Sequence, residues 1–223
     1  MPLANRKELN PMSKGQNKKE TNPWVTQHTK LVYSNPWIQV QEHQVLNPAG
    51  NPGIYGVVSF KNVAVGIVPI DSQGFTYLVG QYRYPLNTYS WEIIEGGCPI
   101  GEPLLLGAQR ELAEETGLSA AHFHYLLDLH TSNSVTDEHA TVFIATGLEQ
   151  GTALPEETEQ LTLQHCHIDQ AIEWAKNGTI TDAISLAALL KIDSLKKNAG
   201  WPPNPNFLSE LPRPQIWEER YPL

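Results

Sequence analysis

The sequence has little of what marks secreted, membrane-spanning or nucleic-acid-binding proteins. Only two of its 223 residues are cysteines, which excludes the disulfide framework of a small secreted domain. The longest strongly apolar run, residues 63–70, is far too short to cross a bilayer. Acidic residues outnumber basic ones by 24 to 15, for a net charge of −9. We therefore expect a cytoplasmic protein with two free thiols, no membrane partner and no nucleic-acid partner.

The length of the chain suits one domain with extensions. Residues 1–22 are polar and lack apolar periodicity, so we expect a disordered arm there. Residues 23–60 are expected to form an N-terminal β extension, and residues 61–200 the main domain. Residues 201–223 contain six prolines and two tryptophans, which predicts an extended C-terminal tail.

Hydrophobic periodicity predicts a mixed α/β or α+β fold. Residues 37–45 and 54–60 alternate as strands around a Pro- and Gly-rich turn, which predicts a β-hairpin. Further strands are expected at 63–70, 77–82, 91–95, 122–129, 141–145 and 161–167, and helices at 103–116, 169–177 and 181–192. The strands precede, flank and follow one central helix, so we expect a mixed sheet with helices packed against it.

The most informative stretch, residues 96–118, runs from just before the central helix to just after it. Three glutamates recur there at positions i, i+3 and i+4, and so share one helix face. A glycine directly after the helix is suited to end it. The fixed positions of the stretch are Gly96, Glu102, Arg110, Glu111, Leu112, Glu114, Glu115, Gly117 and Leu118.

These residue types favour a divalent cation. Glu111, Glu114 and Glu115 repel one another when they converge, and a hard cation relieves that repulsion. Oxygen-only ligands select Mg²⁺ or Mn²⁺ over zinc, and such a metal activates water for attack on phosphorus. The carbonyl of Glu95, beside two glycines, is a further candidate ligand. The alternative is an acidic helix face that is simply solvated.

The residues around the three glutamates are predicted to support them. Arg110 lies four residues before Glu114 and is placed to fix its orientation. Glu102 is likewise expected to help orient the metal ligands without binding the metal itself. Gly96 lets the backbone approach the site closely.

Residues 96–118 resemble the Nudix box at every defining position. The resemblance implies the Nudix fold, a mixed β-sheet sandwiched between helices. It also implies hydrolysis of a nucleoside diphosphate linked to another moiety, with two to three Mg²⁺ or Mn²⁺ ions. Glu111, Glu114 and Glu115 would then be metal ligands, and Glu115 is also a candidate catalytic residue.

A weaker likeness over roughly residues 37–192 points to the ADP-ribose pyrophosphatase branch of the family. It is carried by Gln81-Tyr82-Arg83, Trp91-Glu92 and Glu95-Gly96-Gly97, by the loop 132–138, the acidic run 156–159 and Thr181-Asp182-Ala183. By this resemblance Arg83 contacts the diphosphate of the substrate, and Glu92 binds nearby. An arginine fork suits phosphate. The alternative for Arg83 is a surface residue at a strand end.

The general base and the base-stacking residues are predicted from the same likeness. Family members carry the base in a mobile loop after the box, which makes Glu138 the first candidate and Glu157 the second. Trp37 and Tyr55 flank the first hairpin and match positions where aromatics stack the adenine in dimeric relatives. Both side chains are otherwise expected to pack within the hairpin. A homodimer is likewise implied by the resemblance.

The predicted function is thus hydrolysis of ADP-ribose to AMP and ribose 5-phosphate. Another nucleotide sugar or dinucleotide, such as GDP-mannose, ADP-glucose or NADH, stays open as the substrate. A nucleotide-sensing module without hydrolytic activity is the alternative of a different class. The intact set of three glutamates argues against it, because a pure binder has no need of repelling carboxylates.

Overall fold

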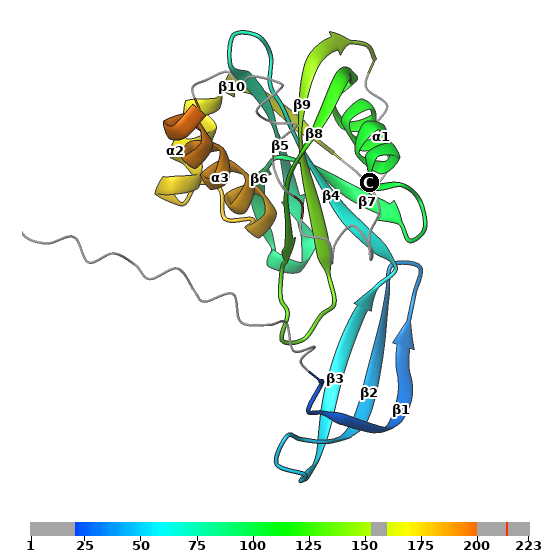
Figure 1. The fold of residues 1–223 in the computed structure, drawn as a ribbon. Coiled ribbons are helices and arrows are strands. Elements are labelled where there is room, and N and C mark those ends of the chain that lie inside the picture. Colours follow the sequence, from blue (N-terminus) through cyan, green and yellow to red (C-terminus); the bar gives the residue numbers. More distant parts are fainter. Residues whose placement is uncertain (1–20, 153–159, 200–212, 214–223) are drawn as a thin grey trace, which may run out of the picture.

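The computed structural model describes residues 21–152, 160–199 and Arg213. Two β-sheets of the main body lie between a single helix on one side and two helices on the other (Figure 1). A third sheet, formed by the N-terminal strands, projects from the body. The prediction of a mixed sheet between helices, with an N-terminal antiparallel extension, is confirmed.

The N-terminal sheet has the antiparallel order β1-β2-β3. Its strands are β1 (Val25–Ser34), β2 (Ile38–Leu46) and β3 (Pro52–Phe60). The predicted hairpin corresponds to β2 and β3, which pair without a break in register. Strand β1 was not expected from the sequence pattern. Every residue of β1 is exposed, so its apolar residues do not alternate between a buried and a solvated face as half-buried strands do.

The mixed sheet of the body has the order β7-β4-β9-β8. Its central strands β4 (Asn62–Pro69) and β9 (His139–Gln150) pair in parallel, whereas β7 (Ile94–Pro99) and β8 (Leu118–His130) pair antiparallel to their neighbours. The other sheet is antiparallel, with order β10-β5-β6. It comprises β5 (Phe75–Arg83), β6 (Thr88–Glu92) and β10 (Thr162–His167), with a 3-10 turn at Tyr84–Leu86.

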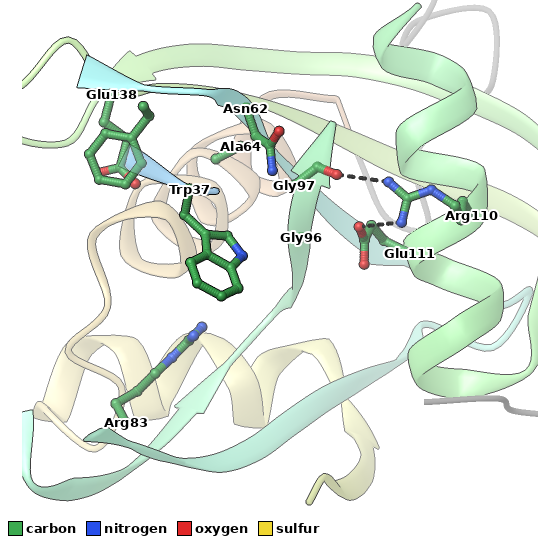
Figure 2. Close-up of a pocket in the computed structure, with 10 residues that line it drawn as sticks. Trp37, Asn62, Ala64, Arg83, Gly96, Gly97, Arg110, Glu111 and Glu138 are labelled. Carbon is green, nitrogen blue, oxygen red and sulfur yellow. Dashed lines mark hydrogen bonds and ion pairs between the residues drawn. The ribbon is translucent and has the colours of Figure 1, made fainter. Parts of the chain in front are cut away.

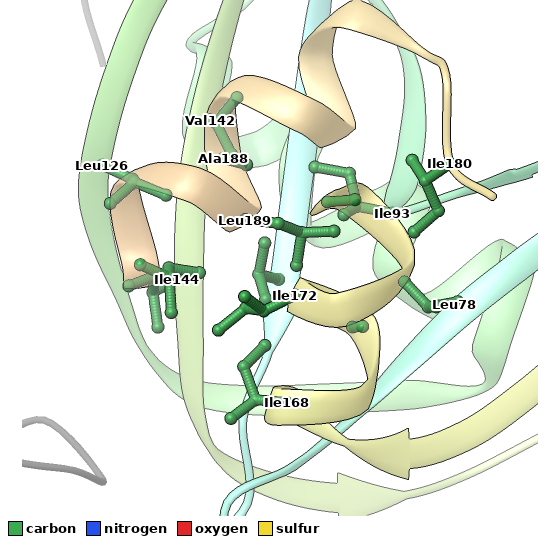
Figure 3. Packing of buried hydrophobic residues seen from close by; sticks show 14 of the residues in the cluster. Leu78, Ile93, Leu126, Val142, Ile144, Ile168, Ile172, Ile180, Ala188 and Leu189 are labelled. Carbon is green, nitrogen blue, oxygen red and sulfur yellow. The ribbon is translucent and has the colours of Figure 1, made fainter. Parts of the chain in front are cut away.

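Two hydrophobic cores lie on opposite faces of β4, because successive side chains of a strand point to opposite sides. Val63, Val65 and Ile67 pack with α1 (Leu104–Thr116). Val68 belongs to the second core, beneath α2 (Ile168–Asn177) and α3 (Ala183–Ala199). Figure 3 shows this second core. The labelled side chains of the two helices there are Ile168, Ile172, Ala188 and Leu189.

Helix α1 closely follows its prediction, and both of its ends have a physical cause. Pro103 precedes the first helical residue, where the missing N–H of a proline costs nothing. Gly117 ends the helix in the left-handed region, with φ of +73°, and donates its N–H to the carbonyl of Ala113. Leu112 is fully buried and fixes which face of the helix meets the sheet.

The chain changes sheets at Ile93, where the sequence predicts one continuous strand over residues 91–95. β6 pairs with β5 in one sheet, and β7 pairs with β4 in the other. At the break, the N–H of Ile93 donates to the hydroxyl of Ser185 in α3, at 2.9 Å. A side chain thus satisfies a backbone group that a continuous ladder would have used. Glu92 and Glu95 are thereby placed on the two sides of this break.

Both cysteines, Cys98 and Cys166, are buried free thiols, as the sequence predicts. Within the described residues, none of the helices combines the length and the apolar composition needed to cross a membrane. The expected arm over residues 1–22 falls almost wholly outside the described residues, as does the expected tail apart from Arg213.

Candidate functional site

Helix α1 and strand β7 meet closely where Glu111 lies over Gly96. A Cβ atom built on Gly96 would stand 1.9 Å from the carboxyl carbon of Glu111. Any side chain at position 96 would therefore displace this carboxylate. The glycine of the motif is needed for this close approach, and only 12% of the Glu111 side chain is exposed.

Arg110 ties the carboxylates of α1 to β7. Its guanidinium donates to Glu111 at 2.8 Å and to the carbonyl of Gly97 at 2.7 Å (Figure 2). It also donates to Glu114 at 3.0 Å. Burial alone would lower the pKa of Arg110, but Glu111 and Glu114 raise it above its ordinary value. The contact with Glu114 is the one the sequence predicts, whereas the contact with the neighbouring Glu111 was not expected.

The three motif glutamates have different surroundings. Glu115 is only 3% exposed, whereas a third of the Glu114 side chain is exposed beside Arg110. No three His, Cys, Asp or Glu side chains of the described residues already form a group that would hold a metal. The donors nevertheless fit a hard divalent cation, since all are carboxylate oxygens, and Gly96 lets the carboxylate of Glu111 approach the backbone of β7.

Arg83 and Glu92 form a bidentate pair at the ends of β5 and β6. The Nε atom of Arg83 donates to both oxygens of Glu92, at 2.9 and 3.1 Å, and Nη2 donates to the same carboxylate. Glu92 is almost completely buried, whereas 38% of the Arg83 side chain is exposed. The hydrogen bond to Glu92 raises the pKa of Arg83 above its ordinary value. The positively charged guanidinium of Arg83 is thus held firmly at the edge of the site.

A second carboxylate lies on the other side of the Ile93 break. Glu95 accepts a hydrogen bond from the hydroxyl of Ser185 at 2.8 Å and lies against Asp182. Burial and then the negative charge of Asp182 raise the pKa of Glu95 well above its usual range. Asp182 also caps the start of α3 by accepting the N–H of Ser185 at 2.7 Å.

Glu138 ends the loop between β8 and β9, and its carboxylate accepts a hydrogen bond from the hydroxyl of Thr131 at the start of that loop. The loop is attached to strand β3. Val58 donates to the carbonyl of Val135 at 3.0 Å and accepts the N–H of Asp137 at 3.2 Å. The N-terminal sheet therefore holds the loop that carries Glu138.

Two adjoining cavities connect these groups. The first, of about 410 Å³, is lined by Trp37, Phe60, Asn62, Ala64, Arg83, Gly96, Gly97, Arg110, Glu111 and Glu138 (Figure 2). The second, of about 450 Å³, shares Arg83 and Glu138 with the first and adds Glu92, Glu95, Thr131 and Asp182 among its lining residues. One end of the combined cleft thus carries two aromatic rings and two arginines, and the other carries mostly carboxyl and hydroxyl groups.

Among the predicted site residues that the structure describes, Tyr55, Glu102, Glu114 and Glu115 line neither cavity. Tyr55 donates its hydroxyl to the carbonyl of Ser134 at 2.8 Å and packs edge-on against Trp24, so in this chain it holds the loop. Glu102 lies next to the thiol of Cys98, at 3.7 Å from its sulfur, and does not line either cavity. Burial and then the charge of Glu102 raise the pKa of Cys98 to about 11. Glu157 lies outside the described residues.

Asn62, Thr131 and Asp182 line the cleft, although the sequence pattern did not predict them as site residues. Asn62 is a polar residue at the start of an apolar strand, and Asp182 is a capping residue before a helix; both signals are visible in the sequence. Neither signal tells which neighbouring strand or loop the residue will face, so their placement at the cleft was not predictable from local pattern.

Comparison with known proteins identifies the family to which this chain belongs. The NUDIX domain matches residues 60–189, and the nucleoside diphosphate sugar hydrolase N-terminal domain matches residues 24–58. An ADP-ribose pyrophosphatase of Mycobacterium tuberculosis is 33% identical over 184 residues, covering 79% of this chain and 84% of the relative. A methanol dehydrogenase activator of Bacillus methanolicus is 29% identical, covering 72% of this chain and 88% of the relative.

A solved structure described as an ADP compounds hydrolase superposes with a TM-score of 0.72 at 21% identity, and the match covers 82% of this chain and 98% of that one. At that identity the likeness establishes the shared fold. The NUDIX match spans more than half of the chain and contains the glutamate-bearing helix α1. The chain therefore belongs to the Nudix family of hydrolases, whose members generally use divalent metal ions.

Proposed function

We propose that this protein hydrolyses ADP-ribose to AMP and ribose 5-phosphate. The observation that carries the proposal is the cleft in which Trp37, Arg83, Glu111 and Glu138 line one cavity. An aromatic ring, a cation and carboxylates are what a purine, a diphosphate and a hydrolytic water each require. The similarity to the M. tuberculosis protein named ADP-ribose pyrophosphatase supports this choice of substrate.

Substrate binding is divided between the two ends of the cleft. Trp37 is 66% exposed and lines the cavity, so its ring has a free face for the adenine. Arg83 points toward Trp37 in Figure 2 and would bind the diphosphate while Glu92 fixes its orientation. The carboxylates of the second cavity would accept hydrogen bonds from the hydroxyl groups of the terminal ribose.

Glu111, Glu114 and Glu115, with the carbonyl of Glu95, would hold two to three Mg²⁺ or Mn²⁺ ions. When bound, such ions neutralise the charge of the diphosphate and lower the pKa of water. Arg110 compensates Glu111 and Glu114 in this structure, so the protein's own cation keeps these carboxylates together. Glu138 would accept the proton of the attacking water from the opposite wall, with Glu157 as the second candidate for that role.

We further propose a homodimer that acts in the cytoplasm. The N-terminal sheet and the residues beside its strands expose several large apolar side chains, as surfaces that bind another protein do. They are Trp24, Val25, Leu31, Val32, Tyr33, Trp37 and Ile54. Two free cysteine thiols are typical of a reducing compartment.

The proposed function is tested with the purified full-length protein and a panel of ADP-ribose, ADP-glucose, GDP-mannose and NADH, each with Mg²⁺, Mn²⁺ or EDTA. We expect metal-dependent release of AMP, with ADP-ribose having the highest kcat/KM. A different best substrate would refute the assignment of ADP-ribose and keep the reaction class. Nucleotide binding without turnover would instead favour the sensing module.

Glu111→Gln tests the role of the motif carboxylates. The amide keeps the shape of the side chain and removes the charge that a cation requires, so we expect kcat to fall on the order of 100-fold or more. Glu173→Gln is the matched control, because Glu173 is an exposed helical glutamate in α2. Equal activity of the Glu111→Gln and Glu173→Gln variants would contradict the proposal.

Glu138→Gln and Glu157→Gln decide which carboxylate is the general base. If Glu138 accepts the proton, its amide variant loses about 100-fold or more in kcat, and the acidic limb of the pH profile disappears. The Glu157→Gln variant should then keep both the rate and the profile. The reverse pattern would assign the base to Glu157, and full activity in both variants would exclude both residues.

Sedimentation equilibrium tests the dimer. We expect twice the chain mass of 24.9 kDa for the wild type. Leu31→Asp places a charge on an exposed apolar position of β1 and should shift the mass toward that of the monomer. Leu163→Asp in β10, also exposed, should leave the mass unchanged. A monomeric wild type would disprove the proposed dimer.

A further inference from the structure

A buried ionic cluster lies at the loop end of the β8–β9 hairpin, where residues 131–138 connect the two strands. Asp128 of β8 has only 1% of its side chain exposed, and it accepts a hydrogen bond from the hydroxyl of Thr141 in β9 at 2.6 Å. The Nε2 atom of His139, also in β9, lies 3.0 Å from the same carboxylate. The β8–β9 pairing thus has a charged group inside it, which is unusual for an interior position.

Arg213 supplies the positive charge of this cluster from 85 residues further along the chain. Its Nε and Nη2 atoms donate to the two oxygens of Asp128, at 3.0 and 3.2 Å. The Arg213 side chain is 4% exposed, and its guanidinium carbon lies 5.6 Å from the centre of the Tyr125 ring. Position 213 lies beyond the residues matched by the NUDIX domain, so the family likeness assigns it no role.

The charge of Asp128 depends on these contacts. Burial would raise the pKa of Asp128, but hydrogen bonds from His139, Arg213 and Thr141 hold it well below its usual range. A buried carboxylate that loses its cation is strongly destabilised. Lysine is not an equivalent replacement, because the planar fork of arginine meets both oxygens at once.

The position of the cluster connects it to the cleft. Asp128 pairs with Thr141, and His130 pairs with His139, so the loop of residues 131–138 starts and ends just beyond the cluster. Glu138 directly precedes the buried His139. On its other side, the loop is bonded to Val58 of β3. Glu138 therefore sits between two attachments, one to the N-terminal sheet and one to the Arg213 cluster.

We propose that Arg213 is a positioning residue for Glu138, acting through Asp128 and His139 to fix the end of the loop that carries this carboxylate into the cleft. The inference rests on the proposed role of Glu138 as the general base. Arg213 thereby has a part in turnover, although it lines neither of the two cavities.

The effect of breaking the Arg213–Asp128 pair distinguishes an ion pair that merely stabilises the fold from one that positions Glu138. Loss of a purely stabilising pair lowers the melting temperature and leaves kcat unchanged at temperatures well below melting. Loss of a positioning pair lowers kcat there, with little change in KM, because Arg83 and Trp37 still bind the substrate. It also loosens the loop whether or not substrate is present.

The experiment uses Arg213→Met in the full-length protein, with Lys196→Met as the matched control. Lys196 of α3 forms an ion pair with Asp169 of α2, a tertiary pair that involves neither β8 nor β9. We expect Arg213→Met to lower kcat about tenfold and the control to retain it. Hydrogen exchange of the amides in residues 131–138 should quicken about tenfold or more in Arg213→Met only.

A double-mutant cycle with Glu138→Gln shows whether Arg213 acts through that residue. If it does, Arg213→Met should lower kcat little further in the Glu138→Gln background. Undiminished loss in that background, or unchanged loop exchange, would overturn the inference. If Arg213→Met does not fold, Asp128→Asn, which removes the charge and keeps the shape, takes its place with the same expected outcomes.

The two proposals fail in distinguishable ways. Wild-type protein without hydrolytic activity on the nucleotide panel would refute the proposed function, and the exchange measurement would still test the attachment of the loop. An active wild type that loses activity with Glu138→Gln, combined with normal kcat and normal exchange in Arg213→Met, would overturn only the inference about Arg213.

Discussion

Three arginines each compensate carboxylates that the fold withdraws from water, and two of these arginines, Arg83 and Arg110, line the cleft. Arg83 holds Glu92 behind the first cavity, and Arg110 joins the carboxylates of α1 to strand β7. Arg213 does the same for Asp128 at the loop end of the β8–β9 hairpin. Without such partners, closely spaced or buried carboxylates would become protonated or move apart. In each of these three places an arginine accompanies the carboxylates.

The backbone makes a matching contribution at two points. The change of sheets at Ile93 directs Glu92 and Glu95 into the second cavity from two different strands. The close approach over Gly96 lets Glu111 of α1 reach the first cavity across β7. Both features place charged groups on strand ends and a helix face, where a packed core restrains them. Rigid elements of this kind hold catalytic groups more accurately than loops do.

The loop of residues 131–138 is the exception, and the structure restrains it from two sides. Hydrogen bonds to Val58 attach it to the N-terminal sheet, and the Asp128 cluster lies at its base. The N-terminal sheet thus has a role in the site besides the proposed dimer contact. Tyr55 illustrates this role. Its hydroxyl binds the loop at Ser134, whereas the family resemblance in the sequence predicts that its ring stacks on the adenine.

The sequence by itself determined helix α1, its glycine end and the spacing of its three glutamates, because helix periodicity and capping act within a few residues. It also indicated Arg83, Glu92 and Glu138 by resemblance, although it left Glu138 and Glu157 as alternatives. Strand β1 was not predicted, since a strand exposed along its whole length carries no alternating pattern.

Only the tertiary structure decided which distant groups meet. Three contacts join elements that are far apart in the chain. They are Arg213 with Asp128, Asp182 with Glu95, and Ile93 at the strand break with Ser185. Their energies depend on burial and on the direction of each side chain, and both quantities arise only when the sheets and helices have packed together. Local sequence pattern specifies neither the burial nor the direction of a side chain.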